Sequence, residues 1–459
     1  MRSKPVQKSG ARSDKIVATV RLVGIAALAC ACASCLTAGS ADDTELKQVI
    51  VFGRHSVRAP QLPNSALNVW SAQPFPDFGV EAGGLTAQGA ADEVLLGAYY
   101  RLWLIEERLL SGEASADAAR VYFRSAQLQR HVDTARSFWA GLLPGAPAKV
   151  VFLSPPTAID PLFQPVEAGI ARLDPAMAAA AVNGRLGNLP QSLAGAYAAE
   201  LALTRSVLFG YPDGEIPVPG IPNGKTDVTA SPFTVSAGTA SAPLVIGGLT
   251  DVTSAIDPFV MEYADGLAES QLGWGSLTPE RISQIARLTT LKEDLRYRTP
   301  SLDRAQSSNL ASHIVRSLVQ AASGSPMRGA LGSPSDRVIV VIASDTDITG
   351  FAGLFDLHWA VSGYPLDFCA PGGALVLELR QSRGSGEHFL RASYVTQTLD
   401  QLRQSTLLTL DSPPVRAPLF IPGCSTGNAN YDCLLEAFVA LARRAIDRQS
   451  VDTEHSFKW

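Results

Sequence analysis

The chain has 459 residues, of which 46% are hydrophobic and 18% are charged, as in an ordinary globular protein with one large domain or two lobes. Its formal net charge of −5 becomes −10 without the first 41 residues, because these hold six basic residues and one acidic residue. A surface this acidic argues against nucleic acid and anionic lipid as partners, so any anionic ligand needs a local basic cluster.

The first 41 residues form a predicted secretory signal. A basic head is followed by the apolar run LVGIAALACACASCL and the small residues TAGSA, which predicts cleavage after Ala41. The apolar run is short for a membrane span, and no later run reaches about 18 uninterrupted apolar residues. We therefore expect a periplasmic or secreted protein without a membrane span. A lipid anchor at Cys30 or Cys35 is the minor alternative.

Five short apolar runs predict buried parallel strands, because β-branched residues dominate them and turn residues bound them. They are QVIVF (48–52), RVYF (120–123), KVVFL (149–153), RVIVVIA (337–343) and ALVLEL (374–379). Between the first two runs, apolar residues recur at helical spacing, which indicates a βαβ unit. HVDTARSFWAGLLPG (131–145) predicts another helix.

From about 160 to 320 the sequence becomes rich in Ala and Leu at helical spacing. We expect an α/β fold with a mostly parallel sheet flanked by helices, and a helical lobe inserted into it. The predicted core comprises residues 42–159 and 321–459, and the lobe comprises residues 160–320.

Polar residues that could act on a phosphate group follow three of the predicted strands. Arg54, His55 and Arg58 follow the first, Arg130 follows the second, and Asp345 follows the fourth. Ligands of parallel sheets bind at the carboxyl ends of the strands, where these side chains would meet. Arginine offers a planar fork of donors for phosphate oxygens, a neutral imidazole can attack phosphorus, and a protonated carboxyl can protonate the leaving group.

Each of these motifs by itself also fits a structural role, as a surface turn or a helix cap. The remaining histidines are interpreted as structural or solvated; they are His131, His313, His358, His388 and His455. Zinc-type spacings of His and Cys are absent after residue 41, so the sequence predicts neither a metal nor a cofactor.

Three cysteines remain after the predicted signal. Cys424 and Cys433 are separated by a turn-rich segment and are the expected disulfide in an oxidising compartment. Cys369 is then unpaired, and a free thiol is a better interpretation than a nucleophile.

The segment RHSVRAP resembles the RHGxRxP motif of the histidine acid phosphatases, and ASDTD resembles their later HD motif. Further similar segments, such as GGLTAQGA and APGGALVLEL, extend the resemblance over nearly the whole chain after the signal, to the bacterial periplasmic branch with its phytases and glucose-1-phosphatases. The resemblance implies that His55 is the nucleophile and Asp345 the proton donor. It also implies that Arg54, Arg58 and Arg130 bind phosphate and that Cys424 is bonded to Cys433.

The chain departs from this family's pattern at several positions. Ser344 stands where the family has a histidine that contacts phosphate, and we expect it to bind the substrate with one hydrogen bond but without a positive charge. Asp347 replaces the usual asparagine. No lysine follows the Arg-Ala-Pro of the first motif, and this shortage of cations favours a small sugar phosphate over a hexaphosphate. Asp265 stands where the glucose-1-phosphatase pattern has an acidic residue that contacts the sugar.

The sequence therefore predicts an exported acid phosphatase that hydrolyses small phosphomonoesters, such as glucose 1-phosphate, through a phosphohistidine. Two alternatives stay open. One is a phytase, and the other is a degenerate member that binds a phosphorylated ligand without turning it over.

Overall fold

The computed structural model describes residues 43–210 and 221–452. The predicted signal, residues 1–41, lies outside the described residues. In these two described ranges, no helix is both long and apolar enough to cross a membrane.

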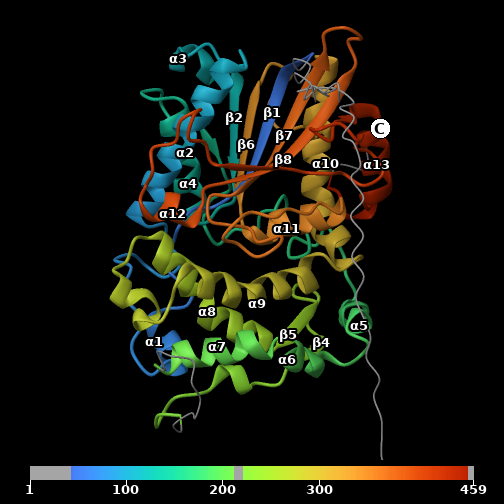
Figure 1. Cartoon of the computed structure of the whole chain (residues 1–459). Helices are drawn as coiled ribbons and strands as arrows, with labels where there is room; N and C mark the ends of the chain where they lie inside the picture. The colour runs from blue at the N-terminus through green and yellow to red at the C-terminus, as the bar shows by residue number, and fades with distance from the viewer. Residues whose placement is uncertain (1–42, 211–220, 453–459) are drawn as a thin grey trace, which may run out of the picture. The chain divides into compact units, whose positions relative to one another are not determined.

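The centre of the fold is an eight-stranded mixed sheet in the order β10-β8-β7-β1-β6-β2-β3, with β9 paired to β8 (Figure 1). β1, β6, β2 and β3 run parallel to one another, whereas the pairs on the other side of β1 are antiparallel. The strands are β1 (Thr44–Arg54), β2 (Val121–Ser125), β3 (Val150–Val151), β6 (Val338–Ala343), β7 (Ala374–Ser382), β8 (His388–Thr396), β9 (Val415–Pro418) and β10 (Cys433–Leu434).

The α/β class with a parallel centre is confirmed, and the direction of one predicted strand is wrong. The run ALVLEL forms β7, which pairs antiparallel with β1 and with β8. A short turn joins β7 to β8, and such a turn can only connect antiparallel neighbours. The apolar pattern shows that a strand is buried but carries no information on its direction. The run KVVFL contributes only Val150 and Val151, at the sheet edge.

Alternate residues of β1 face opposite layers of helices. Val49 and Val51 pack among residues of α2 (Ala87–Glu106) and α4 (Gln129–Leu142). Ile50 and Phe52 pack among residues of α10 (Leu302–Ser323), α11 (Asp345–Leu354) and α13 (Leu435–Ala445). This two-residue period buries both faces of the strand, and Figure 1 shows α2 and α4 on one side of the sheet and α10 and α13 on the other.

A separate apolar cluster belongs to the helical region. It joins residues of α5 (Pro175–Arg185), α7 (Ala198–Leu208), α8 (Leu249–Ala264) and α9 (Pro279–Tyr297), and the hairpin of β4 (Thr234–Ala237) and β5 (Leu244–Gly247). Leu67 and Phe75, from before the predicted lobe, pack in this cluster, whereas Leu310 in α10 packs in the cluster under the sheet. The division of the chain at residues 160 and 320 stays a prediction. The remaining short helices are α1 (Asn64–Leu67), α3 (Ala114–Asp117), α6 (Leu193–Ala196) and α12 (Leu399–Arg403).

Cys424 and Cys433 form a disulfide, with their Cα atoms 5.2 Å apart, and Cys369 is a buried free thiol. The bond ties the loop before β10 to the edge of the sheet.

Candidate active site

His55 lies immediately after β1, and backbone hydrogen bonds on both sides fix its position. Its N–H donates to the carbonyl of Ala343, the last residue of β6, and its own carbonyl accepts from Gly372. The side chain is 1% exposed, and Nδ1 lies 2.8 Å from the carbonyl oxygen of Ser56. Because a carbonyl can only accept, Nδ1 carries the ring proton, and Nε2 keeps its lone pair.

The surroundings of His55 keep its ring neutral. Burial is the largest cause that lowers its pKa, and the positive charges of Arg54, Arg58 and Arg130 lower it further, well below the ordinary value. The imidazole therefore keeps a free electron pair even in acid. This is the state that a nucleophile needs.

Three arginines surround this imidazole. Arg54 ends β1, donates to the carbonyl of Cys369 at 2.5 Å and lies 3.1 Å from Asp345. Arg58 donates to both carboxylate oxygens of Asp257, at 2.8 and 2.9 Å. Arg130 lies in the first turn of α4, and burial together with the charge of Arg58 lowers its pKa to about 10. Within the described residues, Arg130 has no ion-pair partner, so its guanidinium is free to bind an anion.

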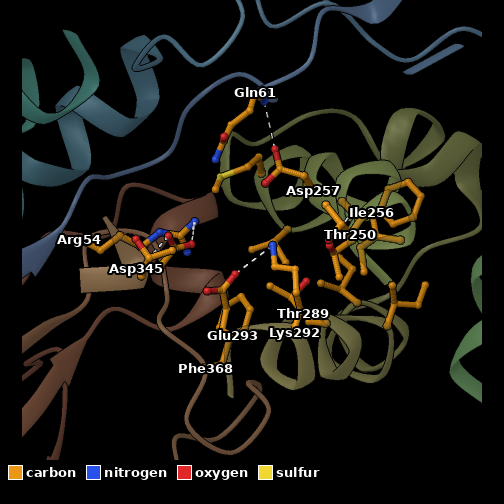
Figure 2. Close-up of a pocket in the computed structure, with 18 of the residues that line it drawn as sticks. Arg54, Gln61, Thr250, Ile256, Asp257, Thr289, Lys292, Glu293, Asp345 and Phe368 are labelled. Atoms are coloured by element: carbon orange, nitrogen blue, oxygen red, sulfur yellow. Dashed lines mark hydrogen bonds and ion pairs between the residues drawn. The ribbon is translucent and has the colours of Figure 1, made fainter. Parts of the chain in front are cut away.

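A cavity of about 300 Å³ opens beside Arg54, Arg58 and Asp345. Its far wall comes from the helical region: α8 contributes Asp257, and α9 contributes Lys292, Glu293 and Arg296. Figure 2 shows Lys292 paired with Glu293 opposite Arg54 and Asp345. The expectation of few cations around the site is wrong, since Lys292 and Arg296 reach it from a distant part of the chain.

Asp345 is the first residue of α11, and its charge state differs from the sequence-based expectation. Burial raises its pKa, but the nearby charges of Arg54, Arg58 and Lys292 together outweigh burial and hold the pKa below its usual value. In the ligand-free site the carboxyl group is therefore ionised, not protonated as expected.

Ser344 and Asp347 lie at the N-terminus of α11, beside a second cavity of about 240 Å³. The N–H of Ser344 donates to Oδ2 of Asp347 at 2.9 Å, which caps the helix. Burial raises the pKa of Asp347 to about 7.

His131 belongs to this group, although the sequence interpretation made it structural or solvated. Its side chain is 2% exposed, its ring centroid lies 5.3 Å from that of His55, and its Nε2 lies 3.1 Å from Oγ of Ser344. The solvated alternative is therefore wrong. The position of His131 next to Arg130, at the start of a helix that follows β2, was the available signal.

Asp265 does not line either cavity. It follows the end of α8, where burial raises its pKa above the ordinary value and the nearby Thr86 side chain opposes this only in part. The acidic residue that α8 places in the first cavity is Asp257. Within the described ranges, no group of three or more His, Cys, Asp or Glu side chains is arranged to hold a metal ion.

Both the sequence and the fold of this chain are similar to those of known phosphatases. Residues 45–199 match the family model described as the histidine phosphatase superfamily (branch 2). The chain is 27% identical to Phytase AppA of Escherichia coli (strain K12), over 89% of this chain and 94% of the relative. It is 28% identical to a glucose-1-phosphatase of Salmonella typhimurium, over 86% of this chain and 91% of the relative.

Among solved structures, the fold is similar to the Hafnia alvei phytase in complex with tartrate. The TM-score is 0.79 at 26% identity, and the match covers 90% of this chain and all of that one. The same phytase in complex with myo-inositol hexakis sulphate matches with a TM-score of 0.77.

Proposed function

The chain belongs to branch 2 of the histidine phosphatase superfamily and is a histidine acid phosphatase, and from this premise we propose that it hydrolyses small sugar phosphates through a phosphohistidine at His55. The observation that carries the proposal is a buried, neutral imidazole with a free Nε2, surrounded by three arginines. This arrangement suits a tetrahedral dianion whose phosphorus faces Nε2.

The proposed reaction has two steps. Nε2 of His55 attacks phosphorus, the bond from phosphorus to the ester oxygen breaks, and the leaving alcohol takes a proton from Asp345. A water molecule then attacks the phosphohistidine, gives its proton to Asp345, and inorganic phosphate is released. Arg54, Arg58 and Arg130 bind the peripheral phosphate oxygens in both steps.

Asp345 must gain a proton before it can act as an acid. In the empty site, the positive charges of Arg54 and Arg58 hold the pKa of Asp345 low. A bound phosphate dianion would neutralise part of these charges. The pKa would therefore rise on binding. Activity is consequently expected to be highest in acid, where binding and protonation are both favoured.

The choice of substrate rests on the charges of the first cavity. Four cations line it, Arg54, Arg58, Lys292 and Arg296, but Asp257, Glu293 and Asp345 offset most of that charge. Asp257 already binds Arg58 through two hydrogen bonds. A substrate with a single phosphate and a neutral polar remainder, such as glucose 1-phosphate, fits this near-balance better than a hexaphosphate.

Phytase activity is the second candidate, because Lys292 and Arg296 could bind additional phosphates. A non-catalytic role in binding a phosphorylated ligand is the third, since Ser344 and Asp347 depart from the family pattern. Purified protein assayed near pH 5 with an aryl phosphate, glucose 1-phosphate and phytate separates the three. A higher kcat/KM for phytate than for glucose 1-phosphate would assign the phytase, and no hydrolysis of any substrate would leave only the binder.

The covalent step has a direct test. Labelled substrate quenched without acid should leave an acid-labile phosphohistidine on the wild-type protein and none on His55→Ala. Activity of His55→Ala equal to that of the wild type would overturn the proposed mechanism.

We also propose that the protein is exported to the periplasm or the exterior. The disulfide between Cys424 and Cys433 supports this, because disulfides persist in oxidising compartments. N-terminal sequencing of protein recovered from the producing cells tests the predicted cleavage after Ala41, and a lipid-modified cysteine would be seen by mass spectrometry.

A further inference from the structure

We propose that His131 is a phosphate-contacting residue of this site, which donates a hydrogen bond from Nδ1 to the phosphoryl group while Ser344 holds its Nε2. The inference rests on the proposed function and adds a contact that comes from α4, not from the N-terminus of α11.

The position of His131 places its ring inside the cationic cluster. Its ring centroid is 5.3 Å from that of His55, and Arg130, Arg58, Arg54 and Asp345 all lie close enough to affect its pKa. His131 therefore lies among the groups that we assign to phosphate binding.

Within the described structure, one ring nitrogen of His131 lacks a hydrogen-bond partner that a bound ligand could supply. Nε2 is 3.1 Å from Oγ of Ser344, whereas Nδ1 is buried and has no hydrogen-bond partner among the described residues. A buried polar nitrogen without a partner is unfavourable. An apolar side chain could fill the same space without that unfavourable term, so packing alone does not account for a histidine here.

The hydroxyl of Ser344 decides which nitrogen carries the proton. If Oγ–H donates to Nε2, the neutral ring has its proton on Nδ1, the nitrogen without a partner. Burial and Arg130 lower the pKa of His131 to about 3, so the ring is neutral in the empty site and carries one proton, which this hydrogen bond from Ser344 leaves on Nδ1. Nδ1 then presents an N–H donor to an anion.

The site can therefore hold an imidazole donor even though residue 344 is a serine. A histidine introduced at 344 would have to occupy the space into which His131 already reaches. We accordingly expect Ser344→His by itself to weaken phosphate binding through a clash with His131.

Two substitutions of His131 separate its nitrogens. Asparagine places an amide near the position of Nδ1, and glutamine places one near Nε2. Inorganic phosphate binding, measured by calorimetry near pH 5, should weaken about tenfold or more in His131→Gln, as for loss of one hydrogen bond to a charged group. It should stay within about threefold of the wild type in His131→Asn. His388→Gln, a histidine of β8 outside both cavities, serves as the control.

Near-normal binding by His131→Gln together with loss in His131→Asn would overturn the inference, because His131 would then act only by holding Ser344. Equal losses in two folded variants would overturn it as well, since Nδ1 would have no separate role. Should either variant fail to fold, nitrogen NMR of wild-type protein with bound phosphate still decides: a proton on Nδ1 of His131 is expected, and a neutral ring protonated on Nε2 would contradict it.

The two proposals fail in different ways. If the wild-type protein binds phosphate but hydrolyses no phosphomonoester, the proposed function fails while the calorimetric test of His131 stands. If hydrolysis proceeds and the His131 variants show that phosphate binding does not depend on Nδ1, only the proposed role of His131 fails.

Discussion

Asp345 is the residue whose chemical role depends most on its surroundings. It is 3.1 Å from Arg54, and this ion pair must be weakened by the bound phosphate before the carboxyl can hold a proton. The same group can then protonate a leaving alcohol and later accept a proton from water. Substrates whose leaving groups differ in basicity test this role, because a strongly basic leaving group needs the proton from Asp345 more than a weakly basic one does.

Asp345→Asn is predicted to lower kcat for a sugar phosphate by about 10²-fold or more, the range for loss of a general acid. Hydrolysis of an aryl phosphate should fall much less, because its leaving group needs little protonation. Initial rates for both substrates on wild type and variant provide the comparison, and equal losses for the two substrates would remove Asp345 from this role.

At the scale of elements, the N-terminus of α11 brings Ser344, Asp345 and Asp347 to the site within four consecutive residues. Asp347 caps the helix through the N–H of Ser344, and its charge state changes near neutrality because burial raises its pKa to about 7. Below that pH its carboxyl is neutral. Above it, a negative charge lies beside the proposed phosphate position.

Asp347→Asn keeps an oxygen acceptor for the cap but never carries the charge. Inhibition by inorganic phosphate should therefore be similar in wild type and variant at pH 5. At pH 8 the variant should bind phosphate more tightly than the wild type, because only the wild type has gained the charge. Inhibition constants at both pH values check this, and a variant weaker than wild type at pH 8 would contradict it.

The helix α4 carries Arg130 and His131, and close packing against α2 sets its position. A Cβ atom on Gly141 would lie 2.0 Å from the carbonyl oxygen of Val94, and one on Gly97 would lie 2.2 Å from that of Phe138. Only glycine permits this approach of the two backbones.

Gly141→Ala should force α4 away from α2, lower the free energy of unfolding by about 1–3 kcal/mol as overpacking does, and weaken phosphate binding by displacing Arg130. Thermal unfolding and calorimetry measure the two effects. Gly184→Ala in α5 is the matched control, because a Cβ there meets open space. If Gly141→Ala unfolds at the same temperature as the wild type, the prediction is contradicted, because α2 and α4 can then move apart without loss of stability.

For the described molecule as a whole, several buried carboxyl groups link stability to pH. Burial raises the pKa of Asp303 to about 6, of Asp92 to about 7 and of Glu262 to about 8. Between about pH 4 and these values each group is protonated in the folded protein and ionised in the unfolded chain. The folded state then binds more protons, so its stability falls as pH rises.

These three carboxyl groups, together with Asp347, outnumber His55 and His131, whose lowered pKa values have the opposite effect on stability. The melting temperature is therefore expected to be higher at pH 5 than at pH 8, with a difference of a few degrees. Glu262→Gln should reduce the difference, because it removes one of the groups whose ionisation opposes folding. Calorimetric scans of both proteins at the two pH values test this. A melting temperature that rises from pH 5 to pH 8 would show that other groups dominate.

Features that depend only on neighbouring residues could be predicted from the amino-acid sequence. The apolar runs identified β1, β2 and β6 because a strand buried on both faces is a property of consecutive residues. The motifs RHSVRAP and ASDTD pointed to the phosphatase family, and the close pair Cys424 and Cys433 pointed to the disulfide.

The distant residues that complete the site could not be predicted, because their positions depend on how the helices and strands pack. Asp257, Lys292 and Arg296 reach the cavity because α8 and α9 pack opposite the ends of the strands, roughly 200 residues or more after β1 in the chain. His131 meets Ser344 across 213 positions. Such contacts depend on how helices pack and on which direction a strand runs, as for β7. Neither is encoded in the local alternation of apolar and polar residues, since the same alternation is compatible with more than one arrangement of the elements.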